Sequence, residues 1–142
     1  MSSLTDPKAI LLRGDPIAYE AKAGGAITPG HILALGADGV VSVSGASAAT
    51  RIPTLVAREN EVVGGGIDDA YAAADRVLYY HLRPGDEFYG ILATGANVAT
   101  GAALTYSAGV LAAAGGNYVI AQAMEAVNNT TGAPVRIRAR AI

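Results

Sequence analysis

Residues 57–90 read ARENEVVGGGIDDAYAAADRVLYYHLRPGDEFYG, and the rest of the chain is organised around them. This stretch holds seven of the twelve acidic residues, four of the seven tyrosines and the only phenylalanine. Its charged residues gather in loop-like runs, whereas most of its aromatic residues fall in two apolar runs, residues 76–82 and 88–92. Between these runs, Pro84 and Gly85 favour a turn. The stretch therefore predicts two β-strands on a rigid scaffold, flanked by polar loops.

Short apolar runs separated by turn residues continue on both sides of this stretch. They predict strands at residues 19–23, 31–35, 40–43 and 52–57 before it, and at residues 102–106, 110–112, 118–127 and 135–141 after it. Asp38 and Gly39 carry a β-hairpin signal. The last run alternates apolar side chains with three arginines, as an amphipathic strand does. The chain is therefore predicted to be all-β.

The two halves of the chain resemble each other. Residues 25–41 align with residues 95–111, with a slip of one residue near Asp38, and residues 75–80 align with residues 133–138. We therefore predict a small β-barrel or two-sheet sandwich built from two similar halves. The first half carries a longer insertion, residues 59–74, and an insertion on one copy of a repeat is where a specific binding role is expected.

The N-terminal segment is predicted to be separate from this scaffold. Residues 1–20 are expected to form an extended arm, and residues 21–142 a single β domain. Pro7 and Pro16 keep the residues before them out of the helical region. The arm carries a short apolar segment at Ile10, Leu11 and Leu12.

Composition narrows the classes of function. Charged residues make up 15% of the chain, against about 25% in an ordinary soluble domain, which favours a surface partly covered in an assembly. The net charge of −2 and the absence of a basic stripe argue against nucleic-acid binding. No apolar run approaches the roughly 18 residues that cross a bilayer, and the N-terminus lacks the pattern of a signal peptide. We therefore expect no membrane partner, and synthesis in the cytoplasm of the producing cell.

No constellation of residues indicates catalysis, a metal or a cofactor. Cysteine is absent, and His31 and His81 each stand alone. The glycines at residues 64–66 are not followed by the Lys of a phosphate-binding loop. A divalent ion among the carboxylates of residues 68–87 stays open, but their spacing lacks the pattern of a dedicated cation loop. Ion pairs with neighbouring arginines are the simpler account, so we expect no enzyme and no cofactor.

Several motifs of this chain are similar to those of a known family. They are ITPG at residues 27–30, ARENE at 57–61, GIDDAYAAADRV at 66–77 and RPGDE at 83–87. Together they resemble the head decoration, or capsid cement, proteins of tailed bacteriophages, over most of residues 15–142. Residues 66–77 and 83–87 are the most specific part of the resemblance, and the second half looks like the generic barrel of these proteins.

The resemblance implies a non-enzymatic virion protein, made in the host cytoplasm, that binds the outside of the expanded icosahedral shell. It would bridge neighbouring major capsid subunits at local three-fold or two-fold axes and so stabilise the shell. Its partners would be the major capsid protein and further copies of itself, with a homotrimer favoured and a homodimer possible. The arm is expected to add a strand to an exposed sheet edge, since main-chain hydrogen bonds then supply affinity.

Candidate interface residues lie in the arm and in the two loops of the central stretch. They are Ile10, Leu11 and Leu12 in the arm, Arg58, Glu59, Asn60, Glu61, Asp68, Asp69 and Tyr71 in the first loop, and Arg83, Asp86, Glu87 and Tyr89 in and after the second. Two alternatives stay open. A carbohydrate-binding β module on the phage head is weakened by the absence of Trp, and a cupin-type enzyme needs clustered histidines that the chain lacks.

Overall fold

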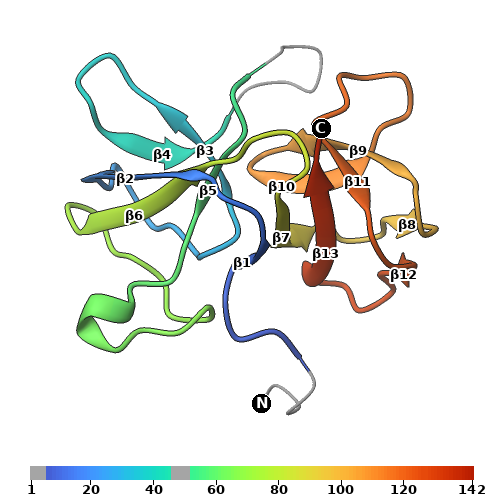
Figure 1. Cartoon of the computed structure of the whole chain (residues 1–142), viewed down its shortest axis with the longest axis horizontal. Coiled ribbons are helices and arrows are strands. Elements are labelled where there is room, and N and C mark those ends of the chain that lie inside the picture. Colours follow the sequence, from blue (N-terminus) through green and yellow to red (C-terminus); the bar gives the residue numbers. More distant parts are fainter. Residues whose placement is uncertain (1–5, 46–51) are drawn as a thin grey trace.

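The protein is all-β in a computed structural model that describes residues 6–45 and 52–142. The predicted fold class is therefore confirmed. Figure 1 shows two lobes side by side, with the N-terminal segment running between them. The first lobe contains β2 (Ile17–Lys22), β3 (Ile32–Leu35), β4 (Val41–Val43), β5 (Leu55–Ala57) and β6 (Arg76–His81). The second contains β7 (Glu87–Leu92), β8 (Asn97–Val98), β9 (Ala103–Ser107), β10 (Val110–Ala113), β11 (Ala121–Ala123), β12 (Val127–Asn128) and β13 (Val135–Ala141).

The second lobe is a closed barrel. Its strands follow the order β7, β13, β11, β9 and β10, with antiparallel neighbours throughout. A parallel pairing of Leu92 with Leu111 then joins β10 back to β7 and closes the ring. Ile137, Ala139 and Ala141 of β13 are buried inside, as the alternation of this strand predicted. The small side chains of Ala139 and Ala141 suit the narrow interior of a five-stranded ring.

The first lobe repeats the same connectivity. Its strands follow the order β2, β6, β5, β3 and β4, and a parallel bridge between Ala23 and Val41 joins β4 to the end of β2. The closing hydrogen bonds also match, because Gly24 N–H donates to the Val41 carbonyl just as Ala93 N–H donates to the Leu111 carbonyl, both at 2.8 Å. The internal repeat predicted from the sequence is therefore confirmed in its connectivity. The predicted alignment of residues 75–80 with 133–138 is wrong by two residues, because Tyr79 opposite Tyr19 is equivalent to Ala139 opposite Phe88.

The slip in the sequence repeat has a structural cause in the hairpins. Leu33 pairs with Val43 across the first hairpin, and the equivalent pair across the second is Leu104 with Ala113. The first pair is ten residues apart and the second nine, so the first hairpin is one residue longer. Each hairpin turns at a glycine with positive φ, Gly39 or Gly109.

The apolar core of the second lobe reaches into the first lobe. One buried cluster fills the first lobe, and a larger one fills the second lobe and extends to Ile32, Val56 and Ile67 of the first. Ile32 N–H donates to the Gly109 carbonyl at 2.8 Å, which joins the lobes through the main chain. Because apolar contacts and hydrogen bonds both cross the junction, we expect the lobes to behave as one unit.

The predicted arm over residues 1–20 needs correction. Residues 17–22 form β2, which pairs along its whole length with β6. Strand β1 (Leu11–Arg13) lies antiparallel to β7 of the same chain, so the arm adds its strand within the molecule. Residues 1–5 of the predicted arm lie outside the described residues. A second correction concerns residues 118–127, where β11 and β12 are separate strands with a bend between them rather than one strand.

Candidate interaction surface

The central stretch, residues 57–90, contains the segment that connects the first lobe to the second. Its insertion, residues 59–74, joins β5 to β6 and includes a short 3₁₀ helix, η1 (Glu61–Val63). Its second loop, residues 82–86, joins the first lobe to the second between β6 and β7. The predicted strands at residues 76–82 and 88–92 correspond to β6 and β7.

Three of the predicted interface residues are buried and hold the insertion to the N-terminal segment. The Glu59 Oε2 accepts a hydrogen bond from Ile10 N–H at 2.9 Å. Ile10 is fully buried, and Glu59 and Tyr71 are nearly so. The Tyr71 hydroxyl donates to the Arg58 carbonyl at 2.7 Å, and burial raises the pKa of this phenol. These side chains are internal, so none of the three is available to a partner.

Asp86 is a fourth predicted interface residue that the structure buries. Its carboxylate accepts hydrogen bonds from Arg83 N–H at 2.7 Å and from Asp15 N–H at 3.0 Å. It thereby ties the second loop to the N-terminal segment. Gly14 is required beside it, because Gly14 has a φ of +119° and a Cβ there would lie 2.0 Å from Asp86 Oδ1.

The other predicted residues lie at the surface but not on one patch. Glu61, Asp68, Asp69 and Arg83 are exposed, and Leu11, Leu12, Arg58, Asn60, Glu87 and Tyr89 are half-buried. Most of the charges have intramolecular partners: Asp68 pairs with Arg136 at 3.4 Å, Asp69 accepts a hydrogen bond from Gly66 N–H, and Glu87 lies between Arg13 and Arg140. Ion pairing within the chain therefore accounts for several of the carboxylates of the central stretch.

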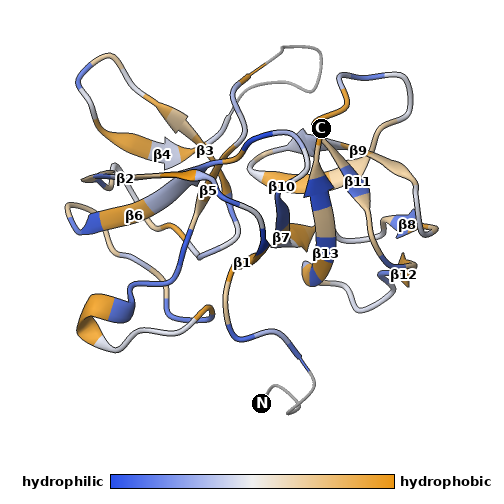
Figure 2. Ribbon diagram, viewed as in Figure 1, coloured by the Kyte–Doolittle hydropathy of each residue, from blue (hydrophilic) through white to orange (hydrophobic). Residues whose placement is uncertain are grey.

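Among the described residues, the most exposed large apolar side chains lie on η1, and the predicted interface residues do not include them. Val62 is 81% exposed and Val63 is 75% exposed. In Figure 2 the short helical turn of the first lobe is coloured as hydrophobic. In the sequence, two adjacent valines between an acidic residue and three glycines were the pattern that could have indicated this exposed apolar site.

The base of η1 is held firmly. The guanidinium of Arg58 pairs with Glu61 and lies over the Tyr80 ring, 5.1 Å from its centre. Gly64 ends the helix in the left-handed conformation, with its N–H bonded to the Glu61 carbonyl at 3.1 Å. The carbonyl of Asn60 accepts from Gly65 N–H at 2.9 Å. The valines are therefore presented on a braced turn.

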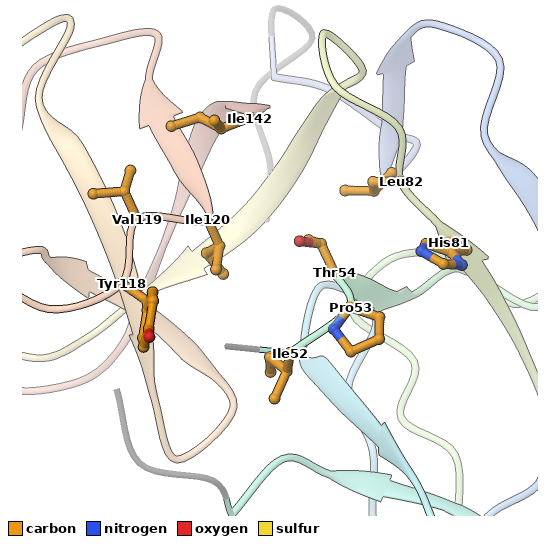
Figure 3. Close-up of a pocket in the computed structure, with 9 residues that line it drawn as sticks. All are labelled: Ile52, Pro53, Thr54, His81, Leu82, Tyr118, Val119, Ile120 and Ile142. Carbon is orange, nitrogen blue, oxygen red and sulfur yellow. The ribbon is translucent and has the colours of Figure 1, made fainter. Parts of the chain in front are cut away.

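A cavity of 630 Å³ lies between the lobes. Figure 3 shows Ile52, Pro53, Thr54, His81 and Leu82 on one side and Tyr118, Val119, Ile120 and Ile142 on the other. Among the described residues, this lining offers one imidazole and no side-chain carboxylate. Over residues 6–45 and 52–142, no three metal-binding side chains come together. Within the same residues, no helix has the length and apolarity to cross a membrane.

No protein-family model matches this chain, and no curated protein sequence does. A solved structure shares its fold, the N base of head fibre gp8.5 of bacteriophage phi29, with a TM-score of 0.55 and 13% sequence identity. The likeness covers 89% of this chain and 93% of that chain. At this identity it shows a common fold, and the protein that this chain is similar to is a phage head component. The structural likeness is thus to a protein of a phage head, and it concerns the fold.

Proposed function

We propose that this chain is a non-enzymatic structural protein of a phage head, which binds the outer surface of the shell and bridges its major capsid subunits. The observation that carries the proposal is the shared fold with a phage head fibre base over 89% of the chain. The motifs of residues 66–77 and 83–87 support it independently, since they resemble capsid decoration proteins. The proposed location is the capsid surface of the virion.

The rigidity of the molecule supports a bridging role. A bridge resists the separation of two shell subunits only if it does not itself deform. Arg136 of β13 donates hydrogen bonds to the carbonyls of Pro29 and Ile67 in the first lobe. Together with the main-chain bond from Ile32 to Gly109, these contacts connect the lobes at several points. A load applied to one lobe is therefore transmitted to the other.

The apolar tip of η1 is the proposed contact with the shell. Val62 and Val63 are exposed, adjacent and held on a braced turn. Exposed aliphatic side chains on a rigid support gain affinity on burial without a large cost in ordering the loop. Their position within the insertion of the first half also agrees with the expectation that the extra segment of a repeat carries specific binding.

Co-sedimentation with empty shells that lack this protein tests the proposal. Wild-type protein should bind to saturation and raise the temperature at which the shells open. The double substitution Val62→Asp with Val63→Asp should weaken binding by about tenfold or more, as loss of a central apolar contact does. The control is Ile142→Asp, which places the same charge on another exposed aliphatic residue at the C-terminus.

Two results would count against the proposal, and they differ. If wild-type protein stays in the supernatant at every concentration, shell binding itself is wrong. If wild type and the double variant sediment equally, shell binding stands, but η1 is not the contact. Equal loss of binding in Ile142→Asp would also remove the special role of the two valines.

A further inference from the structure

Strands β2 and β7 are equivalent in the two lobes. In the second lobe β1 pairs with the outer edge of β7, whereas the same edge of β2 is free among the described residues. Ala23 N–H donates to the Asp75 carbonyl, towards β6, whereas Gly24 N–H donates to the Val41 carbonyl on the other side. Main-chain groups alternate along a strand, so those of Ala18, Glu20 and Lys22 face away from β6. Among the described residues, no strand pairs with this edge over residues 17–22.

The equivalent edge in the second lobe shows what such an edge binds. The matching closing bonds, Gly24 to Val41 and Ala93 to Leu111, place Tyr19 and Glu20 at the positions of Phe88 and Tyr89. Tyr89 N–H donates to the Ile10 carbonyl at 2.7 Å, and Leu11 is paired opposite Phe88 in an antiparallel strand. The main-chain groups of Glu20 therefore stand where those of Tyr89 receive β1.

The side chains next to these two edges also differ: they are buried beside β7 and exposed beside β2. In the second lobe, Phe88 and Tyr106 are fully buried, and Leu11 shares a face with Phe88. In the first lobe the equivalent side chains are Tyr19 and Leu35, which are 46% and 56% exposed. An apolar cavity of 410 Å³ opens between them, floored by Leu33, Leu55 and Tyr79. A side chain in the position of Leu11 is what this end of the first lobe lacks.

A second copy of β1 is a poor occupant for this edge, because β1 is engaged within its own molecule. In the described structure, β1 is already paired with β7. Ile10 before it is fully buried, and its N–H is bonded to Glu59. Releasing β1 to serve a second molecule would leave the Glu59 carboxylate buried without this donor, which is costly.

We propose that β2 accepts an extended segment of another protein, antiparallel to it, with a branched aliphatic residue inserted between Tyr19 and Leu35. The N–H of Glu20 would donate to this segment as that of Tyr89 does to β1. Main-chain hydrogen bonds would supply affinity and the apolar cavity would supply selectivity, as in other strand additions. A six-residue edge strand with exposed apolar side chains and no proline is suited to such pairing. The inference rests on the β2 edge alone and does not depend on shell binding.

A synthetic peptide with the sequence of residues 8–14, Lys-Ala-Ile-Leu-Leu-Arg-Gly, blocked at both ends, is the probe for this edge. It would be titrated into the ¹⁵N-labelled full chain and followed by NMR. We expect saturable shifts of the amides of Ala18, Glu20 and Lys22. Glu20→Pro removes one donor that faces away from β6 and should weaken binding by about tenfold or more, because the ring also blocks the edge. Glu20→Ala keeps the donor and is the matched control.

A second variant separates loss of the edge from loss of folding. Leu35→Lys changes an exposed side chain at the cavity and leaves every main-chain group in place, so it should weaken the peptide as Glu20→Pro does. A scrambled peptide should not bind. Absence of saturable shifts, shifts confined to other strands, or equal binding by Glu20→Pro and Glu20→Ala would each overturn the proposal. So would a wild-type oligomer, seen by light scattering, that Glu20→Pro dissociates, because the occupant would then be a second copy.

Discussion

Arg136 lies on the outer face of β13, but its guanidinium contacts the first lobe rather than solvent. It bonds the carbonyls of Pro29 and Ile67, pairs with Asp68 and lies over the Tyr89 ring, 5.9 Å from its centre. Burial lowers the pKa of Arg136, while Asp68 acts in the opposite direction. The alternation of apolar residues and arginines in residues 135–141 predicted that Arg136 lies on the outer face of its strand. Its partners in the first lobe were not predictable, because they lie 68 to 107 residues away and depend on how the lobes meet.

His31 makes stability depend on pH. Its Nδ1 accepts a hydrogen bond from Thr28 N–H at 3.0 Å, so the imidazole is neutral in the folded protein. Burial, and then the nearby charge of Arg136, lower the pKa of His31 from its ordinary value of 6.5. The unfolded chain therefore binds more protons than the folded protein below pH 6.5, and the free energy of unfolding rises with pH there. The contribution of His31 to the free energy of unfolding is complete above pH 6.5. It is lost as the pH falls from 6.5 towards the lower pKa that His31 has in the folded protein.

The substitution His31→Asn tests this assignment. An Asn side chain presents an oxygen near the position of Nδ1 and does not titrate, so the hydrogen bond from Thr28 can persist. We expect wild-type protein to lose unfolding free energy as the pH falls below about 7, and the variant to lose less. Urea unfolding at a series of pH values measures the difference. Parallel pH profiles for the two proteins would show that His31 does not carry the dependence.

At the scale of elements, β1 is the strand whose position depends most on a single side chain. Glu59→Ala should cost about 1–3 kcal/mol, because it leaves the buried N–H of Ile10 without an acceptor. The loss should appear first as faster hydrogen exchange of the amides of residues 10–13, while those of β9 and β13 stay protected. Glu59→Gln keeps an oxygen acceptor and is the control. Equal acceleration throughout the second lobe would mean that β1 does not open separately.

Local pattern predicted most of the other elements. The hairpin at Asp38, the turn at Pro84 and the alternation of residues 135–141 each gave a strand or turn close to its observed bounds. The location of β1 was not predictable in this way, because its partner β7 lies about 76 residues further along the chain. The same reason explains why Glu59 and Asp86 were taken for surface residues. Acidic residues in polar loops are usually exposed, and only the folded N-terminal segment makes them internal.

At the scale of the whole molecule, the repeat offers its own control for the junction between lobes. Gly39 and Gly109 occupy equivalent hairpin turns and have nearly equal φ values, +80° and +81°. A Cβ on Gly39 would meet nothing within 4 Å, whereas one on Gly109 would lie 2.2 Å from Val43 Cγ1 and 3.3 Å from the Ile32 carbonyl oxygen. The backbone strain of an alanine is therefore common to both sites, and only the second site adds a clash between lobes.

Gly39→Ala should cost about 1–2 kcal/mol, the strain of a left-handed alanine. Gly109→Ala should cost about 1–3 kcal/mol more, because overpacking at the junction is added. Urea unfolding of both variants measures the difference. If the lobes form one cooperative unit, Gly109→Ala should shift a single transition followed by fluorescence and by circular dichroism alike. Equal costs at the two glycines, or two separate transitions, would mean that the lobes are not locked together, and a rigid bridge between shell subunits would lose its physical basis.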